Sequence, residues 1–123
     1  VNLAARLETL TKRYQSSVLI SHHTIAQMED PTRYHLRFID RLQVTGKSRP
    51  VAVFEAIDGD PSPIRDQKLS TMAHFEEGTW LYHRQEFKSA AVCFEECLRQ
   101  FPGDRVAQIY LERSVHAALP TTD

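Results

Sequence analysis

Asn2 and Arg6, near the start of the chain, have side-chain types and a spacing that suit chemistry on a ligand. They stand four residues apart, while Leu3, Leu7 and Leu10 form the apolar stripe of an amphipathic helix, so the pair lies one turn apart on a neighbouring face. A planar guanidinium binds phosphate oxygens well, and a carboxamide can hydrogen-bond sugar oxygens without adding charge. The alternative is an ordinary exposed polar pair, because polar helix faces are the rule in soluble proteins.

Cysteines and histidines give weaker chemical signals. Cys93 and Cys97 lie four residues apart in a helical pattern, a spacing that strains a disulfide and matches no common zinc motif. They are predicted to be buried free thiols of a cytoplasmic protein. His22 and His23 are adjacent, so they face different directions on a helix and make no natural pair of metal ligands. The sequence shows no recognisable Ser/His/Asp or Cys/His motif, and its four glycines form no phosphate-binding loop.

The elements that must position these side chains belong to a small chain. Its 123 residues make one domain or two modules that share a core. Fifteen Lys and Arg residues against sixteen Asp and Glu residues leave a net charge of −1, which gives no electrostatic case for a nucleic-acid partner. No apolar run approaches the ~20 residues that a membrane helix needs, and a cytoplasmic location is expected.

Residues 1–58 are predicted to alternate between helix and strand. The elements expected are a helix to about residue 14, a strand over 16–21, a helix over 22–30 that Ser21 caps and Pro31 ends, and an antiparallel hairpin of strands 34–44 and 51–57. Apolar residues alternate in the first hairpin strand at Leu36, Phe38 and Leu42.

After GDPSP at residues 59–63, which is expected to be a hinge, the apolar period changes from 2 to 3.6. A helical module is predicted over residues 64–119. The first helix is expected to begin at Ser62 and Pro63 and to run to about Arg84. The second ends at Pro102 and Gly103, and its apolar residues are Phe87, Ala90, Ala91, Phe94, Leu98 and Phe101. The third is capped by Asp104 and runs to about Ala118, with the apolar residues Val106, Ile109, Tyr110 and Val115.

Residues 74–102 resemble one tetratricopeptide repeat. Small, aromatic and proline residues occupy the repeat's positions at Gly78, Phe87, Ala90, Phe94 and Pro102, and Cys97 takes a further small position. Small residues there let paired helices approach closely. A generic helical hairpin is the alternative. One repeat and a following helix fall below the ~3 repeats that a free-standing solenoid needs, so this module is expected to pack on something else.

The opening V-N-x-A-A-R-L-E resembles the late catalytic helix of the class III adenylate and guanylate cyclases. SVLIS, V-x-G-K-x-x-P-V and a closing F-E-A continue the likeness through residue 58. The resemblance implies an α+β chain. Residues 1–58 would be the C-terminal part of a ferredoxin-like cyclase domain (helix, strand, helix, hairpin), followed by a TPR-like helical module over residues 64–119. Many bacterial cyclases of this type carry such a helical extension.

In that family two protomers form composite sites, and one protomer supplies metal-binding aspartates to the asparagine and arginine of the other. By this resemblance Asn2 orients the ribose, and Arg6 stabilises charge on the phosphate as the 3′-oxygen attacks the α-phosphorus. The family's turn usually reads V-K-G-K, whereas Thr45 stands here in place of the first lysine. Lys47 is the candidate for substrate binding in its stead, and a solvated turn lysine is the alternative.

The sequence therefore predicts the C-terminal portion of a nucleotidyl cyclase that converts a nucleoside triphosphate, with ATP favoured over GTP, to a 3′,5′-cyclic nucleotide and pyrophosphate. Mg²⁺ or Mn²⁺ is the expected cofactor, held by aspartates upstream of this helix, so the chain alone is expected to be inactive. A homodimer is expected because the strands leave exposed edges and because Phe75, Trp80, Phe87, Phe94 and Phe101 exceed what one hairpin covers. The alternative is a non-catalytic helical module for protein interaction or dimerisation.

Overall fold

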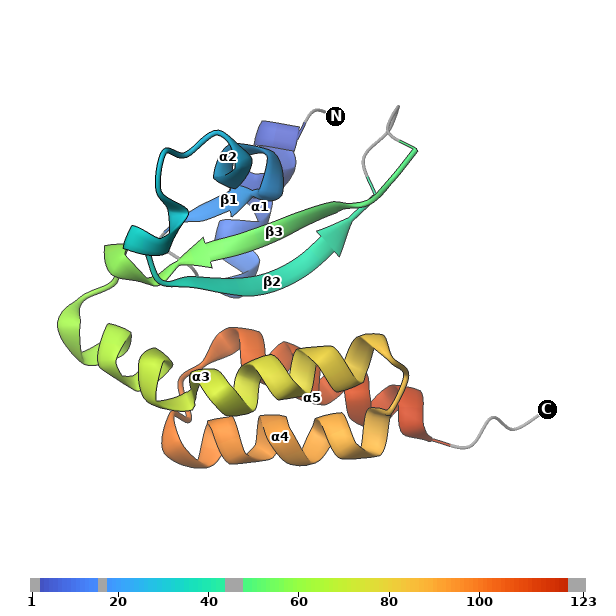
Figure 1. Ribbon diagram of the computed structural model, residues 1–123. Helices are drawn as coiled ribbons and strands as arrows, with labels where there is room; N and C mark the ends of the chain where they lie inside the picture. Colours follow the sequence, from blue (N-terminus) through green and yellow to red (C-terminus); the bar gives the residue numbers. More distant parts are fainter. Residues whose placement is uncertain (1–2, 16–17, 44–47, 120–123) are drawn as a thin grey trace. The chain divides into compact units, whose positions relative to one another are not determined.

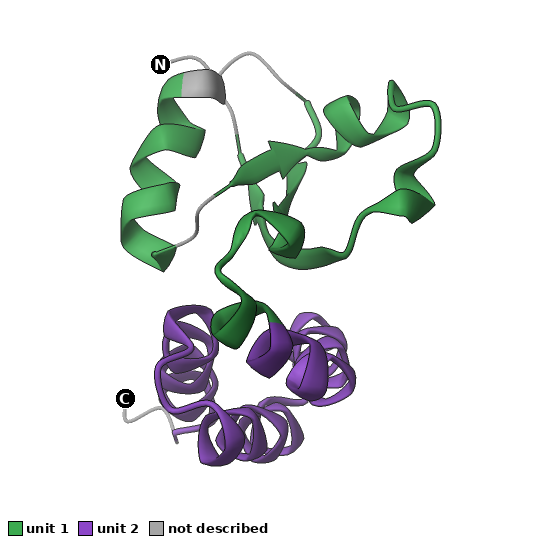
Figure 2. Ribbon diagram, turned by 90° about the vertical axis from the view of Figure 1, so that its left-hand side faces the viewer, with its two compact units in different colours: residues 1–65 green, residues 66–123 purple. Residues whose placement is uncertain are grey.

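The computed structural model describes residues 3–15, 18–43 and 48–119 and has an α+β architecture (Figure 1). Along the chain the elements are α1 (Leu3–Tyr14), β1 (Leu19–Ser21), α2 (His22–Ala26), a 3-10 helix (Pro31–Arg33), β2 (Leu36–Leu42), β3 (Val51–Ala56), a second 3-10 helix (Ile57–Gly59), α3 (Ser62–His83), α4 (Phe87–Gln100) and α5 (Arg105–Ala118). Two compact units divide the chain, residues 1–65 and residues 66–123 (Figure 2). The boundary between them falls in the first turn of α3.

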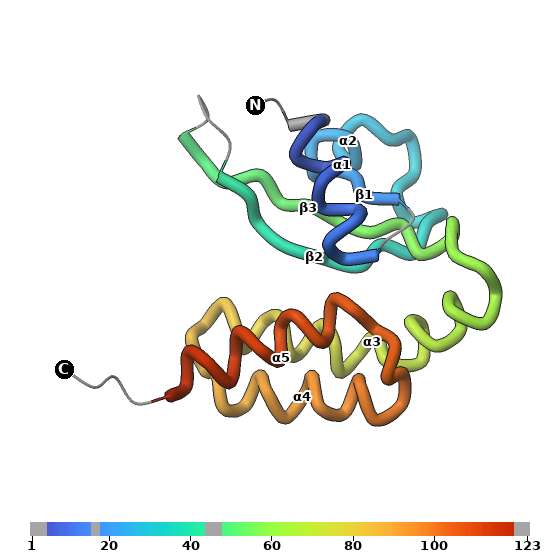
Figure 3. Tube along the Cα trace, turned by 180° about the vertical axis from the view of Figure 1, so that it is seen from behind, coloured from blue at the N-terminus to red at the C-terminus, as the bar shows by residue number. Residues whose placement is uncertain are grey.

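The first unit contains an antiparallel sheet, and its described strands follow the order β1-β3-β2. The predicted hairpin of β2 and β3 is confirmed, with Leu42 opposite Val51. On the other side of β3, Ser21 of β1 lies opposite Val53. Val51 and Val53 are buried, so their side of β3 faces the core of the unit. α1 lies across one face of the sheet, and the segment that contains α2 lies beyond the other face (Figures 2 and 3).

Of the three alternating apolar residues of β2, only Leu42 is buried. Leu36 and Phe38 are only half-buried, whereas Arg37 and Ile39 are fully buried. A bulge between Phe38 and Asp40 also shifts the register against β3. The period of 2 identifies two faces but not which of them is buried. The valines of β3 decide that question, and Arg37 can join their side because Glu55 of β3 is buried with it.

Helix ends in the first unit follow local chemistry. The cap predicted at Ser21 is confirmed, since its Oγ accepts the backbone N–H of Thr24 at 3.4 Å. However, α2 ends at Ala26 and does not reach residue 30 as predicted. The backbone N–H groups of Gln27 and Met28 bond three residues back, which tightens the last turn, and Pro31 disfavours helical geometry in the residue before it.

Three helices pack together in the second unit, close to their predicted bounds (Figure 3). Rings of Phe75, Phe94 and Tyr110 form its core, and the Phe94 and Tyr110 rings stack 5.1 Å apart. Asp104 caps α5 as predicted, because its Oδ1 accepts the Ala107 N–H at 3.3 Å. The expectation that Cys93 and Cys97 are buried is also confirmed.

One expectation about apolar surface in this unit needs correction. Val115, predicted to belong to the apolar face of α5, is 50% exposed. Among the aromatic residues expected to exceed the available cover, Phe75, Phe94 and Phe101 are buried, whereas Trp80 is 59% exposed. The Arg84 guanidinium lies 4.5 Å from the centre of the Trp80 ring. The third helix supplies the cover that a hairpin of two helices lacks.

Candidate functional site

Arg6 lies beside the end of β2 that leads into the hairpin turn. Its Nη1 donates a hydrogen bond to the backbone carbonyl of Gln43 at 3.3 Å, and Gln43 directly follows the last residue of β2. Residues 44–47, which include Lys47, come next in the sequence. The fold thus brings the N-terminal half of α1 to the hairpin, although the two are 37 residues apart in the chain.

A second contact holds the other end of α1. The Tyr14 hydroxyl, at the last residue of the helix, donates to Oδ2 of Asp40 in β2 at 2.9 Å. Arg6 and Tyr14 are separated by about 12 Å of helix, and Asp40 and Gln43 by about 10 Å of strand. Because these spacings match, α1 runs antiparallel to β2, with Arg6 at the hairpin end.

Two of the predicted site residues, Asn2 and Lys47, lie outside the described residues, as does Thr45. Their roles stay predictions. Arg6 is half-buried, on a helix that the sheet supports. The guanidinium carries five N–H donors in a fixed fork, so it can bind a phosphate while one donor stays on the Gln43 carbonyl.

Metal ligation has no candidate in the described residues. In ranges 3–15, 18–43 and 48–119, no group of three or more His, Cys, Asp or Glu side chains could hold a metal ion. His22 and His23 have ring centres 4.0 Å apart, but Nδ1 of His22 accepts the backbone N–H of Ala52 at 3.0 Å. The same ranges contain no helix long and apolar enough to cross a membrane.

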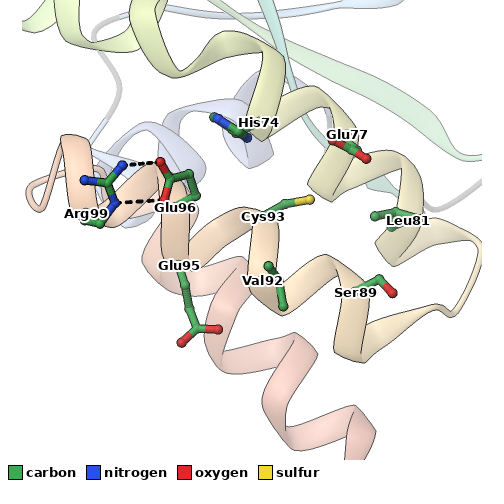
Figure 4. A pocket seen from close by; sticks show the side chains of 9 residues that line it. All are labelled: His74, Glu77, Leu81, Ser89, Val92, Cys93, Glu95, Glu96 and Arg99. Carbon is green, nitrogen blue, oxygen red and sulfur yellow. Dashed lines mark hydrogen bonds and ion pairs between the residues drawn. The ribbon is translucent and has the colours of Figure 1, made fainter.

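A cavity of about 670 Å³ lies between α3 and α4 in the second unit (Figure 4). His74 and Glu77 of α3 face it, together with Cys93 and the ion pair of Glu96 and Arg99 on α4. Hydrogen bonds from Arg99 and Gln100 lower the pKa of Glu96 from 4.5 to about 2. Burial, and then the charge of Glu77, raise the pKa of the Cys93 thiol, so this thiol is a poor nucleophile.

This cavity is not among the features that the sequence predicts. Part of its lining has a local signal, since Glu96 and Arg99 are three residues apart on a helix and so are neighbours. His74 and Glu77 have the same spacing on α3. That these two helices face each other across a cavity depends on the packing of the unit. Its lining combines charges of both signs, on Glu77, Glu96 and Arg99, with apolar side chains such as Val92.

Comparisons with known proteins place the chain near adenylate cyclases. The terminal-differentiation-specific adenylate cyclase of Dictyostelium discoideum is 34% identical over 116 residues, which is 94% of this chain and 6% of that protein. An adenylate cyclase of Anabaena cylindrica is 36% identical over 56 residues, 45% of this chain and 11% of that protein. No family model and no solved structure matches the chain. The predicted relationship to cyclases is therefore confirmed at the level of adenylate cyclases, and the chain spans only a small part of each relative.

Proposed function

We propose that this chain is part of an adenylate cyclase of class III, which converts ATP to 3′,5′-cyclic AMP and pyrophosphate. The observation that carries the proposal is the position of Arg6 beside the hairpin end of β2. The similarity to an adenylate cyclase over 94% of the chain supports it, because that match extends through most of both units.

Arg6 is proposed to neutralise charge during phosphoryl transfer. When the 3′-oxygen attacks the α-phosphorus, pyrophosphate leaves and negative charge shifts over the phosphate oxygens. A guanidinium positioned before the reaction stabilises that charge without rearranging. Asn2, four residues before Arg6 in the sequence, is proposed to hydrogen-bond the ribose, and Lys47 to contact the triphosphate.

The family's divalent metal does not fit the described residues, which offer no cluster of ligands for it. We propose that its carboxylates belong to the remainder of a longer protein, and we derive no step through the metal. The chain alone is then expected to make no cyclic nucleotide in the presence of Mg²⁺ or Mn²⁺. Turnover by the purified chain would show that the metal-binding carboxylates lie within this chain, which contradicts the proposal.

The test of the proposed function is Arg6→Ala in the complete protein. Loss of one donor that stabilises developing charge is expected to lower turnover by about 10²–10³-fold. Arg33→Ala is the matched control, because Arg33 is an exposed arginine of the same unit and lies in the 3-10 helix. Turnover that is unchanged in Arg6→Ala removes Arg6 from the mechanism.

A second candidate function concerns the helical unit, which is proposed to be TPR-like and to mediate association of two copies of the chain. In support, a Cβ on Gly78 would lie 2.8 Å from the Phe94 ring, and Ala90 and Cys97 are fully buried, so small residues sit where helices approach. Val92, beside the α3–α4 cavity, is 65% exposed, so we propose this side of α4 as the surface of contact.

Sedimentation of the chain at micromolar concentration tests this association. A homodimer is expected, and Val92→Glu is expected to shift it toward monomer because a charge replaces an apolar contact. Val18→Glu is the matched control, since Val18 is an exposed valine of the first unit. A clean monomer in the unsubstituted chain would contradict the proposed dimer.

A further inference from the structure

We propose that Tyr14 and Asp40 are positioning residues that set the place of Arg6 along β2, an inference that rests on the proposed function. The strand β2 contains a bulge. Phe38 lies opposite Phe54, but Asp40 lies opposite Val53, the next residue along β3. Ile39 is therefore the extra residue on this strand.

The bulge moves Asp40 to the side of the sheet that α1 covers. In a regular ladder Ile39 would lie opposite Val53, and Asp40 would follow opposite Ala52 with its side chain on the face of Phe38. With the bulge, Asp40 shares the register of Val53 and meets the Tyr14 hydroxyl. Bulges that re-aim a side chain recur beside active sites.

The carboxylate is oriented before it meets the tyrosine. The backbone N–H of Arg41 donates to Oδ1 of Asp40 at 2.8 Å, which leaves Oδ2 toward the Tyr14 hydroxyl. Tyr14 is 2% exposed. A hydrogen bond from a phenol to a carboxylate is one of the stronger hydrogen bonds of proteins, and this one is partly buried.

The helix ends where this bond forms. Gln15 follows Tyr14 with a φ of 53°, a left-handed conformation that stops α1. Arg6 lies two turns earlier, and its contact with Gln43 is exposed and 3.3 Å long. An exposed hydrogen bond contributes little to the position of a helix. The Tyr14–Asp40 bond adds a contact at the opposite end of α1, and we infer that it limits sliding and pivoting of the helix.

The experiment is a double-mutant cycle of Tyr14→Phe and Arg6→Ala in the complete protein. Tyr14→Phe keeps the ring and removes only the hydroxyl, so turnover is expected to fall by about 10- to 100-fold, as for a catalytic group misplaced by about 1 Å. In the Arg6→Ala background Tyr14→Phe is expected to have no further effect on turnover. Tyr34→Phe, which changes an exposed tyrosine of the same unit, is the control.

The outcomes separate this inference from the proposed function. If Arg6→Ala leaves turnover unchanged, the function assigned to Arg6 fails. If Arg6→Ala lowers turnover but Tyr14→Phe does not, only the positioning role fails. An equal loss from Tyr14→Phe with and without Arg6 would show that Tyr14 acts through general stability, which also overturns the inference.

Hydrogen exchange on the chain itself gives a readout besides activity. Tyr14→Phe is expected to speed exchange of the backbone amides in α1 and to leave those of α4, in the other unit, unchanged. Tyr34→Phe is expected to change neither set. Unchanged exchange in α1 would show that the Tyr14–Asp40 bond does not hold the helix on the sheet, and would overturn the inference without any assay of turnover.

Discussion

Arg37 of β2 and Glu55 of β3 form a buried ion pair across adjacent strands. Nε and Nη2 of Arg37 both lie 3.0 Å from Oε1 of Glu55, and the two side chains are 0% and 1% exposed. Their Cα atoms are also partners in the register of the two strands. The pair therefore joins the hairpin at the level of the side chains as well as the backbone.

Removing one charge of this pair is expected to destabilise the chain strongly. Glu55→Gln removes the negative charge that lies 3.0 Å from the buried Arg37 guanidinium, and the free energy of unfolding should fall by about 3–5 kcal/mol. The double substitution Arg37→Met with Glu55→Leu should lose much less. Urea unfolding followed by circular dichroism measures both. The control is Glu86→Gln, which removes a charge from the exposed pair of Glu86 and Arg84. There the free energy of unfolding should change by less than about 1 kcal/mol. Equal effects of Glu55→Gln and Glu86→Gln would contradict this prediction.

Gly78→Ala is expected to destabilise the helical unit, although alanine is the better helix former. A Cβ at this position would lie 2.8 Å from the ring of buried Phe94, and overpacking typically costs about 1–3 kcal/mol. Thermal melting should therefore show a lower Tm. Gly103→Ala is the matched control, with its nearest neighbour at 3.3 Å. The double variant Gly78→Ala with Phe94→Leu is expected to recover part of the lost Tm. A higher Tm for Gly78→Ala alone would show that the helix at Gly78 does not lie so close to the Phe94 ring.

Gln85→Gly is expected to stabilise the chain. Gln85 has a φ of 66°, and the hydrogen bonds from its N–H to the Tyr82 carbonyl and from Glu86 N–H to the Leu81 carbonyl form the Schellman motif that ends α3. A side chain in this left-handed conformation costs about 1 kcal/mol or more. Glycine removes that cost, but the unfolded chain gains entropy when glycine is introduced. The net result should be a rise of up to about 1 kcal/mol in the free energy of unfolding. Gln85→Val should lower it. Chemical denaturation measures both variants. If Gln85→Val were more stable than Gln85→Gly, Gln85 would not have the left-handed conformation.

The carboxyl group of Glu96 should titrate far below the ordinary range of glutamate. Hydrogen bonds from Arg99 and Gln100 lower its pKa from 4.5 to about 2. Because the pKa is lower in the folded chain, the stabilisation from this group is complete above pH 4.5 and is lost as the pH falls through 2. Carbon-detected NMR titration gives the midpoint directly. Arg99→Gln should raise it toward 4.5, and an unchanged midpoint would show that Arg99 is not the cause.

Local signals in the sequence were enough to predict most elements. The limits of α4 and α5 follow from side chains that act within a few residues, such as the Asp104 cap and the break at Pro102 and Gly103. Pro31 predicts the end of α2 at residue 30, whereas the helix ends four residues before that, at Ala26. The Arg6 candidate came from a motif, and no local rule could place it against Gln43.

The sequence by itself determined the long helices and the hairpin strands, because caps, breakers and apolar periods act through neighbouring residues. Tertiary structure decided which face of β2 is buried, since a charged Arg37 becomes a core residue only when Glu55 on another strand compensates it. It also decided the bulge at Ile39 and the meeting of Tyr14 with Asp40, 26 residues apart. These features depend on contacts between segments that are far apart in the sequence. Which segments pair is decided by the packing of the whole unit, and such contacts produce no periodic pattern in the sequence.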